Sequence, residues 1–139
     1  MQGEDIDEVM HIERISFSSP WPESAFLSEM SKKYSLAFVA VLPERIAGYI
    51  CAQHVLDEGH VLNLAVHPDL RKKGIGNALA EETLHRLKKL GCRIFYLEVR
   101  MSNAPAMQFY EHLGFIKVGV RRKYYRTPVE DAALMIRMQ

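Results

Sequence analysis

Apolar residues near the amino terminus recur at the spacing of an amphipathic helix. The helix is expected to begin at Asp5, which has the spacing of a capping box with Glu8, and its buried face comprises Ile6, Val9, Met10, Ile12 and Ile15. Two prolines interrupt this pattern in SSPWPESAF, so the first helix ends near Ser19. Pro22 suits the first turn of a second helix, which is predicted to run to about Lys32.

Runs of apolar and β-branched residues then predict strands. Three are expected in succession, with a tight turn between the first two: SLAFVAVL (35–42), RIAGYICAQHVL (45–56) and HVLNLAVHP (60–68). The remaining elements are expected to be a helix, a short buried strand, a helix and two closing antiparallel strands, over residues 74–91, 94–99, 103–114, 115–126 and 131–138.

The segment from residue 60 to residue 99 has the order strand, glycine loop, long helix, strand. This is a βαβ unit, so its two strands are expected to be parallel. The whole chain, residues 1–139, is predicted to form one α/β (α+β) domain with a mixed sheet of about six strands and about four flanking helices. Ligands of such sheets bind beyond the carboxyl ends of the strands, and the glycine loop and Glu98 both lie near such ends. The two features point to one crevice.

The loop RKKGIGNAL (71–79) has the composition of a phosphate-binding turn. A Walker loop requires a Lys-Ser or Lys-Thr pair after its second glycine, where this chain has Asn77 and Ala78. A dinucleotide fingerprint requires a third small residue, and position 79 is Leu79. What remains is a cationic turn before a helix amino terminus, whose free N–H groups attract anions. The alternative is a tight turn with solvated lysines.

The composition is that of an ordinary soluble globular protein, with 48% hydrophobic and 25% charged residues. A net charge of only +1 argues against a general nucleic-acid-binding protein. Cys51 and Cys92 lack metal-ligand spacing and are expected to be buried thiols, and the six histidines form no cluster, so we expect no metal. The amino terminus is acidic and no apolar run could span a membrane, so a cytoplasmic protein with neither membrane nor direct nucleic-acid partners is expected.

Two residues after the glycine loop, Glu98 and Tyr110, are candidates for a catalytic role. Glu98 interrupts the apolar run IFYLEV, and a buried glutamate needs either an ion pair, with Arg100 the nearest candidate, or a chemical role. Tyr110 completes a helical stripe with Ala106, Phe109 and Leu113, so a packed aromatic ring is the default interpretation.

Two further features have open alternatives. Trp21, between two prolines, either lines a peptide groove or pins the first two helices together. The segment RRKYYR (121–126) is either a solvated edge strand or the rim of a peptide site.

Several motifs taken together resemble the GNAT acetyltransferase superfamily. They are SPWPESAF, the R-x-x-G-x-G loop after NLAVHP, LEVRMSN…FYEHLGF and RRKYYR…EDAALM. The similarity extends over nearly the whole chain and is greatest to the bacterial branch that acetylates the N-terminal alanine of a small-subunit ribosomal protein. It implies a GNAT fold, acetyl-CoA as co-substrate at the central βαβ unit, and a protein amino terminus as acceptor.

The resemblance also implies roles for individual residues. Glu98 would be the general base and Tyr110 the general acid, and the main-chain N–H near Val66 would polarise the acetyl carbonyl. Asn103 matches a further contact of the coenzyme, although it could equally cap a helix. The residues implied to bind acetyl-CoA are Leu64, Ala65, Val66, Arg71, Lys72, Lys73, Gly74, Ile75, Gly76, Asn77 and Asn103.

The amino terminus departs from the family pattern. Only Met1 to Glu4 stand where a first strand is usual, so that strand is expected to be missing or very short, which leaves a sheet edge exposed. The hairpin segment TPVEDAAL also looks short. The alternatives to N-terminal acetylation are a GNAT enzyme acting on a lysine side chain or a small amine, and a CoA-binding module without turnover. A monomer or weak dimer is expected.

Overall fold

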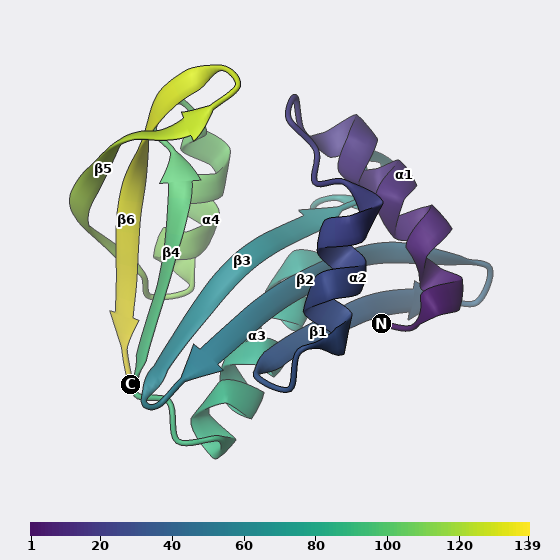
Figure 1. Ribbon diagram of the computed structural model, residues 1–139, viewed down its shortest axis with the longest axis horizontal. Coiled ribbons are helices and arrows are strands. Elements are labelled where there is room, and N and C mark those ends of the chain that lie inside the picture. Colours follow the sequence, from purple (N-terminus) through teal and green to yellow (C-terminus); the bar gives the residue numbers. More distant parts are fainter.

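The structure is a computed structural model that describes all 139 residues. Six strands and four α-helices follow one another in the predicted order, so the mixed α/β architecture is confirmed (Figure 1). The elements are α1 Ile6–Ser16, α2 Glu23–Ser31, β1 Ser35–Leu42, β2 Arg45–Val55, β3 Glu58–Val66, α3 Ile75–Lys89, β4 Ile94–Arg100, α4 Ala104–His112, β5 Ile116–Arg126 and β6 Val129–Met138, with short 3₁₀ helices at Gly3–Asp5 and Pro68–Leu70.

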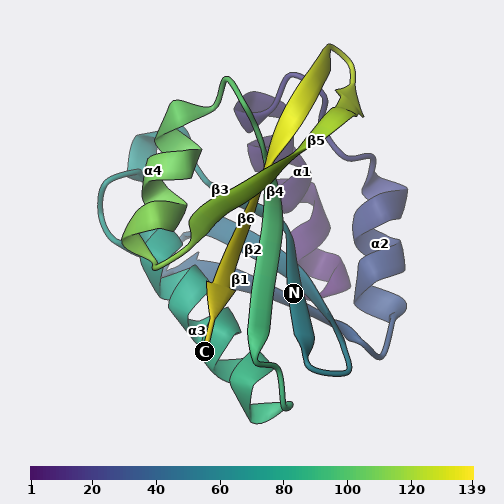
Figure 2. The same ribbon diagram turned by 90° about the vertical axis from the view of Figure 1, so that its left-hand side faces the viewer.

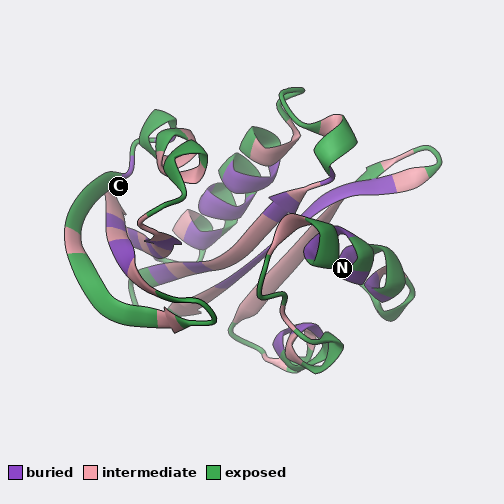
Figure 3. Ribbon diagram, turned by 90° about the horizontal axis from the view of Figure 1, so that it is seen from above, coloured by how far each residue is buried: buried purple, intermediate pink, exposed green.

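The strands form one sheet in the order β1-β2-β3-β4-β6-β5. The pair β3–β4 is parallel, and all other neighbours are antiparallel. Because α3 connects the two parallel strands, the predicted βαβ unit is confirmed. β5 lies at one edge of the sheet, and it is exposed over most of its length (Figure 3).

Helices cover both faces of the sheet. Figure 2 shows α3 and α4 on one side and α1 and α2 on the other. The cluster of 14 buried residues under α3 and α4 includes Leu84, Leu87 and Phe95, and the cluster of 9 under α1 and α2 includes Phe26 and Tyr49. Burial of one large apolar side chain contributes about 1.5–3 kcal/mol. Cys51 and Cys92 lie in these clusters as free thiols, as predicted. None of the helices is long and apolar enough to cross a membrane.

The two parallel strands separate soon after they meet. The register pairs only Glu58, Gly59 and His60 of β3 with 94–96 of β4, although both strands continue beyond these residues. On its other side β3 stays paired with β2. Ala52 of β2 pairs with Val61 and Cys51 pairs with Asn63, so Leu62 is an extra residue of β3 between them. Such a bulge increases the local twist of a strand. The carboxyl ends of β3 and β4 therefore diverge and leave an opening in the sheet (Figure 1).

The amino-terminal residues contact the edge strand β1. Residues 1–5 form no strand, as predicted, and the amino group of Met1 donates to the carbonyl oxygen of Ala37 in β1 at 2.9 Å. The predicted capping box of Asp5 and Glu8 is wrong. The carboxylate of Glu8 instead accepts a hydrogen bond from the backbone N–H of Ile46 at 2.9 Å, which ties α1 to the start of β2.

Gly48 allows β2 and β3 to approach each other, which leads to a prediction. A Cβ atom at this position would lie 2.6 Å from the carbonyl oxygen of Ala65 and 3.2 Å from Cα of Val66. Gly48→Ala should therefore lower the free energy of unfolding by about 1–3 kcal/mol, as overpacked substitutions do. Urea unfolding followed by circular dichroism measures the change. Gly119→Ala is the control, because its Cβ would meet no atom within 4 Å. Equal stability of the two variants would contradict the prediction.

Candidate active site

One cavity of about 640 Å³ opens where β3 and β4 diverge. Four parts of the fold line it: the α1–α2 connection, the separated ends of β3 and β4, the first two turns of α4, and the hairpin of β5 and β6. Four of the predicted site residues are among those that line it: Leu64, Glu98, Asn103 and Tyr110. Residues far apart in the sequence are thus brought to one place, as the position of the βαβ unit predicts.

Glu98 lies on β4 two residues beyond the last pairing with β3. Its side chain is only 6% exposed, and each carboxylate oxygen accepts a hydrogen bond: Oε1 from Nε2 of His60 at 2.6 Å, and Oε2 from Nε of Arg121 at 3.0 Å. Burial by itself would raise the pKa of this carboxyl group, but His60 and Arg121 together hold the pKa below its ordinary value. Glu98 is therefore a carboxylate that stays ionised although it is buried.

Glu98 does have an ion-pair partner, but that partner is Arg121 and not Arg100, the candidate nearest in the sequence. Arg100 pairs with Glu130 instead. His60 and Arg121 were missed because their proximity depends on strand register and order: His60 is the β3 partner of Tyr96, and Arg121 comes from the edge strand β5. The only available signal was the position of His60 in the first strand of the βαβ unit, and it could not be used without the register.

Tyr110 is packed as its helical stripe predicts and also lies at the cavity. Its ring packs edge-to-face against Phe109 and Phe115, with centroids at 5.1 and 5.7 Å, and the residue also lines the cavity. Burial, with a smaller effect of Tyr125, raises the pKa of the Tyr110 hydroxyl above its ordinary value. The hydroxyl is therefore a proton-bearing donor at neutral pH.

Leu64, Ala65 and Val66 lie on β3 beyond its pairing with β4. They remain paired with β2, so their other backbone edge faces the opening in the sheet. Asn103 caps α4, with Oδ1 accepting a hydrogen bond from the N–H of Ala106 at 3.2 Å, and it also lines the cavity. Asn103 is thus a helix cap at the position that the resemblance assigns to a coenzyme contact.

The glycine loop lies beside this opening and does not line the cavity itself. Gly74 has φ +82° and directly precedes α3, whose first turn carries no acidic residue. The residues from Lys72 to Asn77 therefore present cations and free N–H groups, which suit a diphosphate. Arg71 is engaged elsewhere: Nε donates to the carbonyl oxygen of Val66 at 3.0 Å, and Nη2 donates to Ser16 Oγ at 3.3 Å.

The α1–α2 connection forms the wall opposite the hairpin, and a buried glutamate fixes it. Glu13 is 1% exposed and accepts hydrogen bonds from the backbone N–H of Trp21 at 2.8 Å, from Nδ2 of Asn63 at 2.8 Å and from the hydroxyl of Tyr49. Trp21 packs on Phe26 of α2 with ring centroids 5.0 Å apart, as the structural alternative predicts, and it also lines the cavity. The sequence did carry a signal for Glu13, which was missed: it lies four residues after Val9 and three after Met10, on the apolar face of α1.

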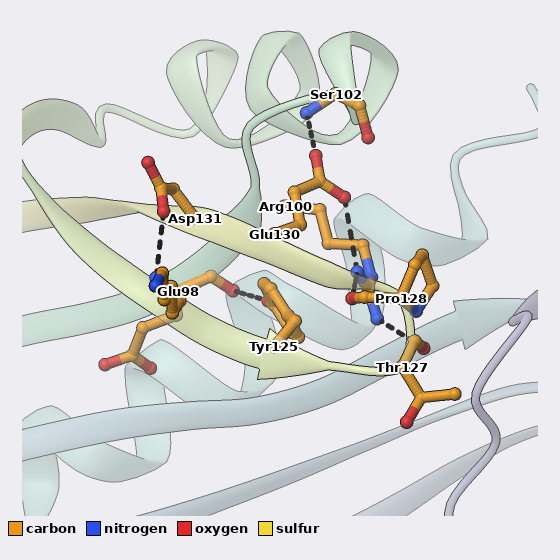
Figure 4. A network of polar contacts seen from close by, with 9 residues as sticks. Glu98, Arg100, Ser102, Tyr125, Thr127, Pro128, Glu130 and Asp131 are labelled. Carbon is orange, nitrogen blue, oxygen red and sulfur yellow. Dashed lines mark hydrogen bonds and ion pairs between the residues drawn. The ribbon is translucent and has the colours of Figure 1, made fainter.

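The hairpin of β5 and β6 forms another wall, and Arg100 holds it in place (Figure 4). Its guanidinium donates to the carbonyl oxygens of Thr127 and Pro128, each at 3.0 Å, and to Glu130 at 3.2 Å. It also lies 4.2 Å from the centre of the Tyr125 ring, whose hydroxyl donates to the carbonyl oxygen of Glu98 at 3.3 Å. The segment 121–126 is therefore both an exposed edge strand and part of the cavity wall.

The acetyltransferase (GNAT) family profile matches residues 6–115. The chain is 39% identical over 137 residues to the ribosomal protein bS18-alanine N-acetyltransferase of Escherichia coli, over 97% of this chain and 92% of that protein. The crystal structure of the ribosomal-protein-S18-alanine N-acetyltransferase from Escherichia coli superposes with a TM-score of 0.89 and 36% identity, over 99% of this chain and 90% of that one.

Two more distant proteins extend the similarity. An N-alpha-acetyltransferase of Saccharolobus solfataricus is 36% identical over 148 residues, which cover 96% of this chain and 87% of that protein. Arabidopsis thaliana NAA60, solved in complex with acetyl-CoA, is 22% identical with a TM-score of 0.90, over 99% of this chain and 95% of that one, and shares the fold.

The contacts of Arg100 lead to a prediction about the hairpin. Arg100→Met keeps most of the side-chain stem but removes all three hydrogen-bonded contacts with residues 127, 128 and 130. Hydrogen bonds of charged groups contribute about 1.5–3 kcal/mol, so amide exchange over residues 124–130 should accelerate by about 10-fold or more. Hydrogen–deuterium exchange with mass spectrometry measures this. Arg93→Met, at an exposed arginine, is the control. Unchanged protection of the hairpin in Arg100→Met would refute its role as a clamp.

Proposed function

Since the chain belongs to the acetyltransferase (GNAT) family and is an acetyl-CoA-dependent N-acetyltransferase, we propose that its acceptor is the α-amine of a protein amino terminus, the N-terminal alanine of ribosomal protein bS18. The observation that carries the proposal is the joint position of Glu98 and Tyr110. A carboxylate whose side chain is only 6% exposed and a partly buried phenol line one cavity at the opening between β3 and β4. A transferase needs both, whereas a module that only holds the coenzyme needs neither.

The reference pKa values of amines favour an α-amine as the nucleophile. An α-amine with a pKa near 8 costs about 1.4 kcal/mol to deprotonate at pH 7, whereas a lysine with a pKa near 10.4 costs roughly 4.6 kcal/mol. Glu98 is a weak base, because His60 and Arg121 lower its pKa. It suits the smaller task better.

We assign Glu98 as the general base. Its carboxylate takes the proton from the acceptor ammonium, directly or through a water, and the freed nitrogen then attacks the acetyl carbonyl carbon. The backbone N–H near Val66, on the unpaired edge of β3, is assigned to polarise the carbonyl oxygen.

We assign Tyr110 as the acid. As the carbon–sulfur bond breaks, its hydroxyl donates a hydrogen bond to the departing thiolate, and the second proton of the attacking nitrogen leaves to the thiolate or to solvent. A phenol with an ordinary pKa near 10 already makes full transfer to a thiolate uphill by about 2 kcal/mol, and burial raises the Tyr110 pKa further. Hydrogen-bond stabilisation of the sulfur therefore contributes more than complete proton transfer.

The coenzyme is assigned to the residues around the glycine loop. Leu64, Ala65 and Val66 would hold the pantetheine arm along the open edge of β3, and the loop from Lys72 through Lys73, Gly74, Ile75 and Gly76 to Asn77 would bind the pyrophosphate. Asn103 would add a contact from the start of α4. Arg71 would support this site indirectly, by holding the carbonyl oxygen of Val66.

The alternative acceptors define the first experiment. Peptides that begin with Ala-Arg, Ser, Met or Gly, each with an internal lysine, are incubated with the enzyme and acetyl-CoA, and fragmentation mass spectrometry locates the acetyl group. Acetylation of the α-amine, fastest for the alanine peptide, is expected. Acetylation of the lysine instead would refute the proposed acceptor and indicate another GNAT branch. Binding of CoA without transfer to any peptide would indicate a binding module.

The catalytic assignments lead to a second prediction. Glu98→Gln and Tyr110→Phe should each lower kcat by about 10²–10⁴-fold with little change in KM for acetyl-CoA, because each removes one acid or base group. Steady-state kinetics with the alanine peptide measure the loss. Glu111→Gln, on the exposed side of α4, and Tyr34→Phe, at the distant α2–β1 turn, are matched controls. Wild-type turnover by either site variant would remove that residue from the mechanism.

A further inference from the structure

The two hydrogen-bond donors of Glu98 differ in how firmly they are held. The imidazole of His60 is 21% exposed and stacks on the ring of Tyr96 with centroids 4.2 Å apart and planes 13° apart. His60 is also the last residue of β3 that pairs with β4. The side chain of Arg121 is 48% exposed on the edge strand β5. His60 is therefore the more rigid of the two donors, and it is the one that can fix the orientation of the carboxylate.

The bond between His60 and Glu98 has a defined direction. An ionised carboxylate can only accept hydrogen bonds, so the hydrogen must be on Nε2 of the imidazole. The distance from Nε2 to Oε1 is 2.6 Å, which is typical of a charge-assisted hydrogen bond. Protonation at Nδ1 leaves this bond in place and adds a full positive charge beside the carboxylate.

The other charged or titratable groups around this pair come from β3, β4 and β5. Arg121 on β5 bonds to Glu98 directly, and Glu58 lies at the start of β3. Three tyrosines face the pair: Tyr96 on β4, and Tyr124 and Tyr125 on β5. Burial is the largest cause that raises the pKa of each of them, to about 12 for Tyr125, so all three stay neutral. Histidine is the side chain that gains a proton between about pH 5 and 8.

We propose that His60 is a pH-sensitive positioning residue for the general base, holding the Glu98 carboxylate through Nε2 and weakening its basicity when the imidazole is protonated. The inference rests on the proposed role of Glu98. Protonation of His60 lowers the basicity of Glu98, because a cation beside a carboxylate favours its ionised form and lowers its affinity for the proton of the acceptor amine. A proton on the imidazole would therefore lower the activity of the enzyme in acid.

Two variants separate the holding of the carboxylate from the titration of the imidazole. His60→Gln keeps an N–H donor of similar reach but cannot take up a proton, whereas His60→Ala removes the donor as well. At pH 8, we expect His60→Gln to keep kcat within about 3-fold and His60→Ala to lose about 10-fold, the range typical of residues that orient a catalytic group. KM for acetyl-CoA should not change in either variant.

The pH profile of kcat/KM for the alanine peptide gives the decisive readout. The proposed proton transfer starts from the Glu98 carboxylate and the acceptor ammonium. The pKa of Glu98 is held below its ordinary value and that of an α-amine is near 8, so this pair alone leaves kcat/KM nearly constant between pH 7.5 and 5.5. We expect kcat/KM of the wild type to fall by about 10-fold over this range, and that of His60→Gln to lack this fall. His54→Gln is the control, because His54 lies on the neighbouring strand β2 without a contact to Glu98, and it should retain the wild-type profile.

The outcomes are distinguishable. An active wild type whose pH profile is shared by His60→Gln would overturn this inference and leave the proposed function in place. Wild-type kcat in His60→Ala would also overturn it. Absence of peptide acetylation by the wild type would overturn the proposed function and this inference together. If His60→Ala does not fold, the profile of His60→Gln still decides.

Discussion

The separation of β3 and β4 is the constraint on which the rest of the structure depends. A sheet interior normally satisfies the backbone groups of every strand, but here only three residue pairs join the two central strands. The two halves of the sheet must therefore be held together by other means. Helix α3 connects the two strands, and the core that it shares with α4 contains Phe95 and Leu97 of β4 together with Val61 of β3. The open end can then carry unpaired backbone groups and the charged side chain of Glu98 without loss of the fold.

The order of elements was predictable because each depends on local pattern. Apolar spacing, prolines and glycines marked the helices and strands, and the βαβ unit followed from their succession. The partners of Glu98 were not predictable, because they depend on which residues lie opposite one another in a sheet whose order is not sequential. Arg100, two residues away, was the natural candidate from the sequence, yet it faces the hairpin at Thr127 and Pro128.

Several residues for which the sequence offered a structural and a functional interpretation have the predicted packing or capping contacts and also line the cavity. Trp21 packs on Phe26 and lines the cavity, and the ring of Tyr110 packs in an aromatic cluster while the residue lines the same cavity. Asn103 caps α4 at the cavity edge. This is physically reasonable, because a group that must be placed accurately is best held by packing or by a cap. A structural explanation for a residue in this region is therefore not evidence against a functional one.

Glu98 illustrates a conflict that the site must resolve. A buried carboxylate needs donors to remain ionised, but each donor weakens it as a base. With both oxygens engaged by His60 and Arg121, Glu98 stays charged at 6% exposure and is correspondingly less basic. In its proposed role as the base, Glu98 would serve an amine that is already partly neutral at pH 7, and it would be poorly matched to a lysine, whose deprotonation costs roughly 3 kcal/mol more. The electrostatics that keep Glu98 ionised would thus also restrict the nucleophiles that it could deprotonate, in favour of the weakly basic α-amine of the proposed acceptor.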